Sequence, residues 1–472
     1  MTAQRTDSGT DTTPADMTPA DTTPPAPAAD SGAPPRRAAP PGRGTVPATP
    51  PSPAEALAAA RELAPRFAAR AADHDAAGSF PAADFADLRA AGLLGLLVPR
   101  RLGGSGASFA EYTAVAEAVA TGSGATALVY NMHASVTGAL AHTPDALLRE
   151  LGVGEEVFTA RDRALAAAAS GALYGVAMSE RGAGSRLSRI TTAYRRVGDG
   201  FRLTGAKAFV SGAGHADAYL VAARERTDDG APRRDAAAAD GTGEGGTAAD
   251  GTGEGGTAEE TPARVSYFLV PSGEGVRVEP TWDSLGMRAT GSHDLHLDVA
   301  LPADALLGGI DGLAVLLAQV MPQWLVASYA AVYVGVARSA LAAAAEHTRG
   351  RGLEGLPLVR ARLGRADAAT AAAGLVVAEA ARRVSDAPGE PETNRWVWRA
   401  KLVAGDTAAE VASSALEAAG TSATRRGHPL ERIYRDARCG ALQPATSDVC
   451  ADWLGVAALG GDPENAAGPS RW

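Results

Sequence analysis

The sequence has only two cysteines, few aromatic residues and no excess of positive charge. Cys439 and Cys450 are too few for a disulfide framework and fit a reducing compartment, so we expect a cytoplasmic protein. The formal net charge of −10 is unfavourable for binding a nucleic acid, and none is expected as a partner. The N-terminus has no apolar segment of the kind that a secretory signal needs.

Long apolar runs are also scarce, and the one at Trp324–Leu341 has to be tested as a membrane span. It contains Ser328, Arg338 and two tyrosines. A spanning helix needs about 20 apolar residues with few or no charges. We therefore expect a buried helix of a helical bundle and no membrane attachment.

Two segments are too poor in large apolar residues to fold. Residues 1–50 are mainly Pro, Ala, Thr and Asp, and residues 226–262 contain two tandem decapeptides that begin at Asp240 and Asp250. Such compositions cannot bury enough surface to offset the entropy of ordering. The glycine pattern at 241–246 matches a dinucleotide-binding loop only formally, because no strand precedes it and no helix follows. We expect both segments to be disordered.

The rest of the sequence divides into three regions and a short tail at 461–472. Residues 51–171 have apolar residues at helical spacing, residues 172–308 have alternating runs typical of strands, and residues 309–460 have four helical stretches. These stretches are predicted at Ile310–Arg349, Leu356–Val384, Thr393–Ala419 and Pro429–Leu459. Four long helices with short connections predict an antiparallel bundle. The predicted fold class is α+β, with an N-terminal helical domain, a central β-barrel or sandwich and a C-terminal four-helix bundle.

The stretch from Met178 to Ser211 is the most informative part of the chain. After a polar turn rich in glycine come two short alternating runs, Ile190–Arg195 and Phe201–Leu203, joined by a Gly-Asp-Gly turn. A third run, Ala208–Ser211, ends in a hydroxyl. Alternating runs joined by such turns predict a β-meander. Hydroxyls at both ends of the stretch can then converge on one ligand.

Three motifs resemble those of the acyl-CoA dehydrogenase superfamily. The stretch just described resembles its flavin-contacting strands, Trp282–Pro302 resembles a strand that begins Leu-Gly-x-Arg and ends in Val-Pro, and Tyr434–Arg438 resembles its Tyr-Arg-Asp-Ala-Arg motif. They follow in the family's order and approximate spacing. The resemblance implies an enzyme that uses FAD, with FMN as the alternative. It also implies a homodimer or homotetramer, because family members form flavin sites between subunits.

The resemblance also assigns site residues. Met178 and Ser179 match positions that meet the pyrimidine edge of the flavin. Phe209 matches an aromatic residue that packs on the ring system, and Ser211 matches a hydroxyl that approaches the reactive nitrogen. A buried ring with a polar edge needs donors at that edge and an apolar face beside it. Ser185 matches a serine near the thioester, and is the expected substrate-binding residue.

The family's catalytic base is missing. An acyl-CoA dehydrogenase transfers a β-hydride to the flavin while a carboxylate takes the α-proton of the thioester. The usual Glu position, six residues after Arg438, is occupied by Pro444, and the alternative position within Gln323–Gly335 has no carboxylate. The catalytic residue is therefore unknown. Candidates for a relocated base are Asp448, Glu417, His293, Asp294 and His133.

Three functions remain open. The preferred interpretation is a flavin-dependent α,β-dehydrogenation of an acyl-CoA or acyl-carrier thioester, with an electron-transfer flavoprotein as a possible acceptor. The first alternative is a hydroxylase or N-oxygenase of the same fold that receives reduced flavin from a separate flavin reductase. The second is a catalytically silent subunit that binds flavin or acyl-CoA. The absent Glu favours the two alternatives over the first interpretation.

Overall fold

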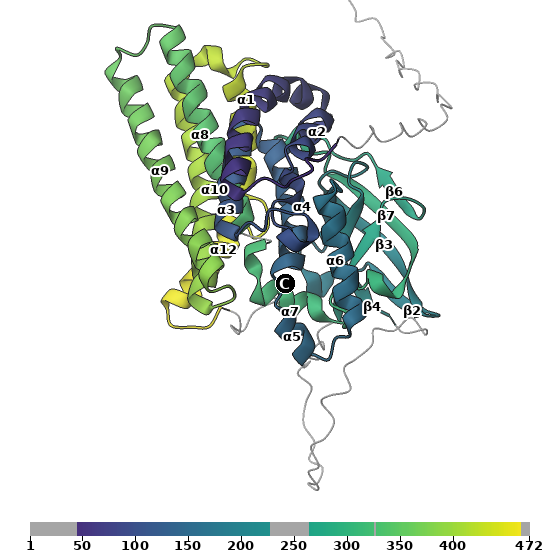
Figure 1. Ribbon diagram of the computed structural model, residues 1–472. Coiled ribbons are helices and arrows are strands. Elements are labelled where there is room, and N and C mark those ends of the chain that lie inside the picture. Colours follow the sequence, from purple (N-terminus) through teal and green to yellow (C-terminus); the bar gives the residue numbers. More distant parts are fainter. Residues whose placement is uncertain (1–44, 227–263, 325–326, 464–472) are drawn as a thin grey trace, which may run out of the picture. The chain divides into compact units, whose positions relative to one another are not determined.

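The computed structural model describes residues 45–226, 264–324 and 327–463 (Figure 1). The expected disordered segments, residues 1–50 and 226–262, lie almost entirely outside these ranges, as does most of the tail at 461–472. All described residues belong to one unit, Arg43–Trp472.

From residue 45 onward, where the described part of the chain begins, six α-helices come first. Their bounds are α1 Pro53–Ala77, α2 Ala82–Ala90, α3 Phe109–Gly122, α4 Gly124–His142, α5 Asp145–Glu150 and α6 Glu155–Ala169. The starts of α1 and α3 are fixed by capping boxes, in which Ser52 or Ser108 exchanges hydrogen bonds with the Glu three residues later. The helix α4 is buried along nearly its whole length, because it lies between the other helices and the β-sheet.

Among the described residues seven strands follow, and they form one sheet in the order β1-β4-β2-β3-β7-β6, with β5 paired to β4. Their bounds are β1 Tyr174–Ala177, β2 Ala193–Val197, β3 Gly200–Val210, β4 Ala218–Glu225, β5 Val265–Pro271, β6 Val276–Glu279 and β7 His293–Leu301. The predicted meander is wrong in one respect, since Phe201–Leu203 and Ala208–Ser211 are not separate strands. Both lie on or at the end of β3, because β7 pairs with it from Phe201 through Lys207 without a break.

The C-terminal region is helical. Its bounds are α7 Leu313–Val320, α8 Ala327–Gly350, α9 Pro357–Asp386, α10 Pro391–Ala419, α11 Pro429–Arg438 and α12 Ser447–Ala458. The helix predicted at Ile310–Arg349 is in fact broken before α8, where Pro322 begins a 3-10 turn and cannot donate a backbone hydrogen bond. The stretch predicted at Pro429–Leu459 is also broken, because Thr446 caps a new helix by accepting from the Val449 amide. The predicted fold class itself is confirmed.

The apolar segment Pro322–Gly350 is long enough to cross a membrane by length and composition. However, 67% of its apolar window is buried inside the fold. Within the described part of α8, Val332, Tyr333 and Val336 have at most 2% of their surface exposed. This is the pattern of a core helix, as the sequence predicted.

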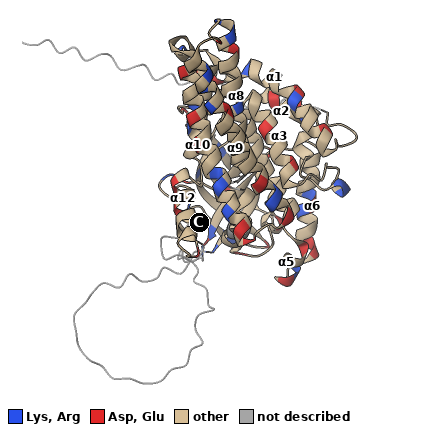
Figure 2. Cartoon of the chain, turned by 90° about the vertical axis from the view of Figure 1, so that its left-hand side faces the viewer, with Lys and Arg blue, Asp and Glu red and all other residues tan. Residues whose placement is uncertain are grey.

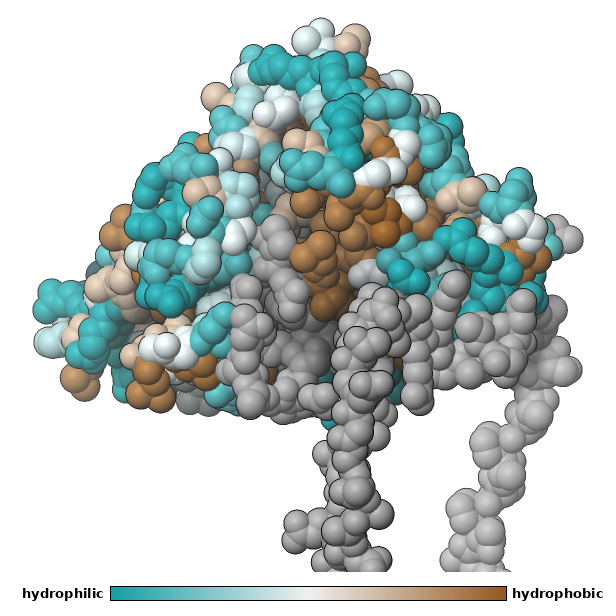
Figure 3. All heavy atoms as spheres, turned by 90° about the horizontal axis from the view of Figure 1, so that it is seen from below, coloured by the Kyte–Doolittle hydropathy of each residue, from teal (hydrophilic) through white to brown (hydrophobic). Residues whose placement is uncertain are grey.

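The surface carries charges of both signs. Acidic and basic side chains are intermixed on the helices of the face in Figure 2. An underside view shows an apolar area bordered by polar residues (Figure 3). The homodimer or homotetramer expected from the resemblance stays a prediction.

The chain has only two lysines, Lys207 and Lys401, and both side chains are shielded from solvent. The Lys401 ammonium donates to the backbone oxygens of Gly440 and Gln443, at 2.8 and 3.2 Å. It thereby ties α10 to the segment between α11 and α12, next to Pro444.

Candidate active site

The expected flavin-binding residues lie where strands β1 and β3 end, and we call them together the flavin ledge (Met178, Ser179, Phe209 and Ser211). The segment after β1 runs beside β3, because the Ala208 amide donates to the Ser179 backbone oxygen at 2.8 Å. Met178 and Ser179 are half-buried, and Ser211 is buried. Ser185 follows a turn that a bridge between Glu180 and Gly184 closes, and it is exposed.

Phe209 has an unusual backbone conformation for its residue type. Its φ is 59°, in the left-handed region that costs a non-glycine residue about 1–2 kcal/mol. The residue is 58% exposed, and its ring meets that of Trp282 edge-on, with ring centroids 6.2 Å apart. A large apolar residue with a strained backbone and an uncovered side chain is typical of a site that binds a ligand. The open face of Phe209 is therefore suited to a flat partner.

Three buried hydroxyls form a chain at the end of the ledge. Ser211 Oγ lies 2.9 Å from Ser292 Oγ, which lies 2.7 Å from Thr290 Oγ1. Thr290 in turn donates to the backbone oxygen of Met287 at 2.8 Å. Because the Thr290 hydroxyl donates to Met287, its oxygen can accept a hydrogen bond from Ser292. The Ser292 oxygen can then accept a hydrogen bond from Ser211. The Ser211 hydroxyl is thus held in place by the turn before β7, which is distant in sequence.

A buried ion pair contacts the backbone of the ledge. The Lys207 ammonium is 2.8 Å from the Glu180 carboxylate and also donates to the Met178 backbone oxygen at 3.1 Å. Burial by itself raises the pKa of Glu180, but Lys207 and the hydrogen bonds of Thr191 and Thr192 outweigh it, and the pKa falls to about 2. Burial lowers the pKa of Lys207 to about 8, against the opposing effect of Glu180. The pair is therefore charged at neutral pH.

His133 is a structural residue in this fold rather than a free base. Its Nε2 is 2.7 Å from the Leu94 backbone oxygen, and its Nδ1 is 3.1 Å from the Tyr174 amide. A neutral imidazole with the proton on Nε2 satisfies both contacts. Burial lowers its pKa to about 4, only partly offset by the bond to Leu94.

Two further base candidates, His293 and Asp294, begin strand β7. His293 Nδ1 accepts a hydrogen bond from the Trp282 amide at 3.0 Å. Asp294 forms an ion pair of 2.7 Å with Arg181. The charge of Asp294 is therefore balanced by Arg181, and neither the histidine nor the carboxylate is free at this position.

The last two base candidates lie on C-terminal helices. Glu417 pairs with Arg362, and Asp448 is exposed in the first turn of α12. Pro444, at the family's usual Glu position, is exposed as well. Nothing in the sequence indicated the Arg362–Glu417 pair, because it joins two separate helices, α9 and α10.

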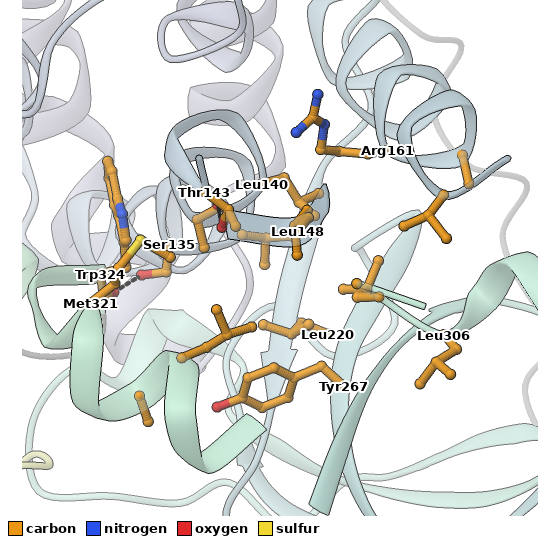
Figure 4. Close-up of a pocket in the computed structure, with 18 of the residues that line it drawn as sticks. Ser135, Leu140, Thr143, Leu148, Arg161, Leu220, Tyr267, Leu306, Met321 and Trp324 are labelled. Carbon is orange, nitrogen blue, oxygen red and sulfur yellow. Dashed lines mark hydrogen bonds between the residues drawn. The ribbon is translucent and has the colours of Figure 1, made fainter. Parts of the chain in front are cut away.

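Beside the ledge lies a pocket, which we call the side pocket (Figure 4). Met178 belongs to both. The walls come from α4, α6 and α7 and from strands β4 and β5. Apolar lining residues include Val136, Leu140, Leu148, Phe158, Leu220 and Leu306. Sequence reasoning missed this pocket, because its walls join segments that are far apart in the chain.

Several of the side-pocket residues carry polar groups. Figure 4 shows Arg161, Trp324 and Tyr267 on different sides of it. One carboxylate, Asp304, is among the described lining residues, and it pairs with Arg163 at 2.7 Å. No sequence signal marked these residues, since Tyr267 occupies an ordinary strand position and Trp324 an apolar stretch.

The order of helical, β and helical regions is that of the acyl-CoA dehydrogenase fold, a fold of flavoenzymes. The family models of the acyl-CoA dehydrogenase N-terminal, middle and C-terminal domains match residues 54–146, 175–241 and 327–447. The chain therefore belongs to the acyl-CoA dehydrogenase family. The family-level recognition made from the three motifs is confirmed.

The relatives differ in their reactions. The chain is 26% identical to the putative acyl-CoA dehydrogenase YdbM of Bacillus subtilis (82% of this chain, 92% of the relative). It is 30% identical to L-evernosamine nitrososynthase of a Micromonospora species (85% and 89%). The FMN-bound structure of TdsC, a dibenzothiophene monooxygenase of Paenibacillus sp. A11-2, superposes with a TM-score of 0.70 at 26% identity (86% and 97%). The family is thus shown, while the reaction is not.

Proposed function

We propose that this chain is a flavin-dependent monooxygenase that receives reduced flavin from a separate reductase. It would add one oxygen atom to a small substrate bound in the side pocket. The main observation behind this proposal concerns the missing base. No described residue at the ledge or in the side pocket offers a free carboxylate to take an α-proton. Dehydrogenation of a thioester needs such a base, which accelerates proton transfer by about 10²–10⁴-fold.

The ledge residues fit a flavin. Met178 and Ser179 would meet its pyrimidine edge, the uncovered ring of Phe209 would pack on its ring system, and the Ser211 hydroxyl would approach its reactive nitrogen. The strained and exposed Phe209 supports this assignment, because a bound ring would cover it. Ser185 is proposed at the outer, substrate-facing side of the turn. FMN or FAD can serve, and FMN is the flavin bound in TdsC.

When bound and reduced, the flavin supplies two electrons to O₂, so that one oxygen atom enters the substrate and the other leaves as water. The protein's own residues then have to hold the substrate and keep bulk water out. The apolar walls of the side pocket suit both tasks. No carboxylate base is required for this oxygen transfer.

Similarity to a nitrososynthase and a monooxygenase supports this proposal. Similarity to YdbM favours the dehydrogenase as the second candidate, with an acyl-CoA as substrate and an electron-transfer flavoprotein as acceptor. A relative described as a 3-sulfinopropanoyl-CoA desulfinase extends the range of reactions in the family.

One experiment separates the candidates. The purified protein, loaded with flavin, is first mixed anaerobically with a panel of acyl-CoAs, and then supplied with reduced FMN, ¹⁸O₂ and a panel of neutral nitrogen, sulfur and aromatic compounds. We expect no bleaching in the first step and one ¹⁸O atom in a product of the second. Rapid bleaching by an acyl-CoA would instead establish the dehydrogenase. Absence of both responses would favour the silent subunit.

A further inference from the structure

The lining residues of the side pocket carry three buried polar atoms that have no hydrogen-bond partner among the described residues. They are the Tyr267 hydroxyl, the Trp324 indole Nε1 and the Arg161 Nε. Tyr267 is 7% exposed and Trp324 is 2% exposed. A buried donor without a partner destabilises the fold, and a bound acceptor would remove that cost. All three atoms are donors, so they favour a ligand with an acceptor.

The other neutral polar groups of the lining are satisfied by the protein. Ser135 Oγ donates to the Trp324 backbone oxygen, and Thr143 Oγ1 donates to the Ala139 backbone oxygen at 2.6 Å. Burial raises the pKa of Tyr267, so its hydroxyl stays protonated and can donate. The indole Nε1 can only donate. The unpartnered groups of the side pocket are thus donors, which need a hydrogen-bond acceptor.

The charges of the described lining are balanced. Arg161 Nη1 lies 2.6 Å from Asp145, and Asp162 lies 3.6 Å from Nη2 of the same guanidinium. Asp304 is neutralised by Arg163. An anionic ligand would therefore lose its hydration without gaining an uncompensated cation, which is unfavourable in an apolar site.

The chemistry of the walls favours aromatic rings. Aromatic side chains come from Phe158, Tyr267 and Trp324, and thioethers come from Met178 and Met321. Aromatic pairs and sulfur–aromatic contacts each stabilise a bound ring beyond its buried area.

We propose that the side pocket binds an uncharged aromatic molecule that carries a hydrogen-bond acceptor, held by Tyr267 and Trp324. The assignment of this molecule as the substrate rests on the proposed monooxygenase function. The proposal that it binds in the side pocket does not depend on that function. Met178 joins the side pocket to the flavin ledge, so a ring bound there would lie next to the proposed flavin.

Binding is tested by calorimetry on the full chain as purified, with quinoline as a neutral ring that has an acceptor. The anion 1-naphthoate and butyryl-CoA serve as charged competitors. We expect quinoline to bind, and Tyr267→Phe and Trp324→Phe each to weaken its binding about 5-fold through the lost donor. Tyr434→Phe, on the exposed face of α11, is the matched control and should leave binding unchanged.

A second variant keeps the test decisive if a donor variant folds poorly. Ala139→Phe places a ring inside the side pocket and should abolish quinoline binding, while circular dichroism and flavin content stay as in the parent. Tighter binding of 1-naphthoate or butyryl-CoA than of quinoline, or unchanged binding in Tyr267→Phe, would overturn the proposal. Quinoline binding without ¹⁸O transfer in the earlier experiment would overturn the monooxygenase and leave this pocket assignment standing.

Discussion

Lys207 and Glu180 form an ion pair of 2.8 Å in which both side chains are almost completely buried. The pair also determines the position of the flavin ledge, because Lys207 donates to the Met178 backbone oxygen. Removing one partner from such a pair strands the other charge in a site where it is poorly hydrated.

Lys207→Met should therefore lower the free energy of unfolding by about 3–5 kcal/mol. The double variant Glu180→Gln, Lys207→Met should be less destabilised than the single one, because no buried charge is left. Urea denaturation of the three proteins measures the difference. A single variant as stable as the parent would show that the pair is dispensable.

The pH dependence of stability should carry a contribution from His133. An unfolded histidine has a pKa of about 6.5 and the folded one about 4, so between these values only the unfolded chain binds the proton. Stability must then fall as the pH decreases from about 6.5 to about 4, by about 3 kcal/mol in total. His133→Gln keeps a donor for Leu94 and an acceptor for Tyr174, and its unfolding free energy should depend less on pH. Parallel pH profiles for the two proteins would contradict the assignment.

Substitutions at Phe209 can separate the effect of backbone strain on stability from the effect of the ring on flavin binding. Phe209→Ala removes the ring and keeps a left-handed non-glycine residue, whereas Phe209→Gly removes both. The glycine variant should be about 1 kcal/mol more stable than the alanine variant, since relief of the strain exceeds the cost of glycine flexibility. Both should lose flavin affinity, and Phe209→Trp should retain it. Thermal unfolding and FMN titration give the two readouts, and a glycine variant less stable than the alanine variant would refute the strain.

Ser211→Ala should leave the fold intact but weaken FMN binding about 5-fold and slow flavin-dependent turnover, because one oriented hydroxyl is lost. Ser211→Thr keeps the hydroxyl and should behave like the parent. Fluorescence titration of FMN and an oxygen-consumption assay measure the two effects. Turnover unchanged in Ser211→Ala would remove this residue from the proposed site.

The sequence allowed the fold class and the family to be predicted, because motifs such as Tyr434–Arg438 and the periodicity of the helices are local properties. Local patterns failed where tertiary pairing decides. The strand β3 continues past Leu203 because β7 pairs with it, and the predicted Ile310–Arg349 helix is interrupted at Pro322.

The individual ledge residues could be proposed from sequence, but their supports could not. The Ser211–Ser292 contact joins residues 81 positions apart, and Tyr267 and Trp324 line the same side pocket although they are far apart in the chain. Such contacts produce no pattern in the sequence of either segment. The side pocket therefore becomes visible only in three dimensions.

The burial of both lysines has a practical consequence for handling the protein. Amine-directed labels and cross-linkers find no accessible side-chain amine on the native chain and are restricted to its N-terminal amino group. Modification of Lys207 or Lys401, followed by mass spectrometry, thus reports opening of the sheet edge or of the bundle. Trypsin, likewise, can cut the native protein only after arginines.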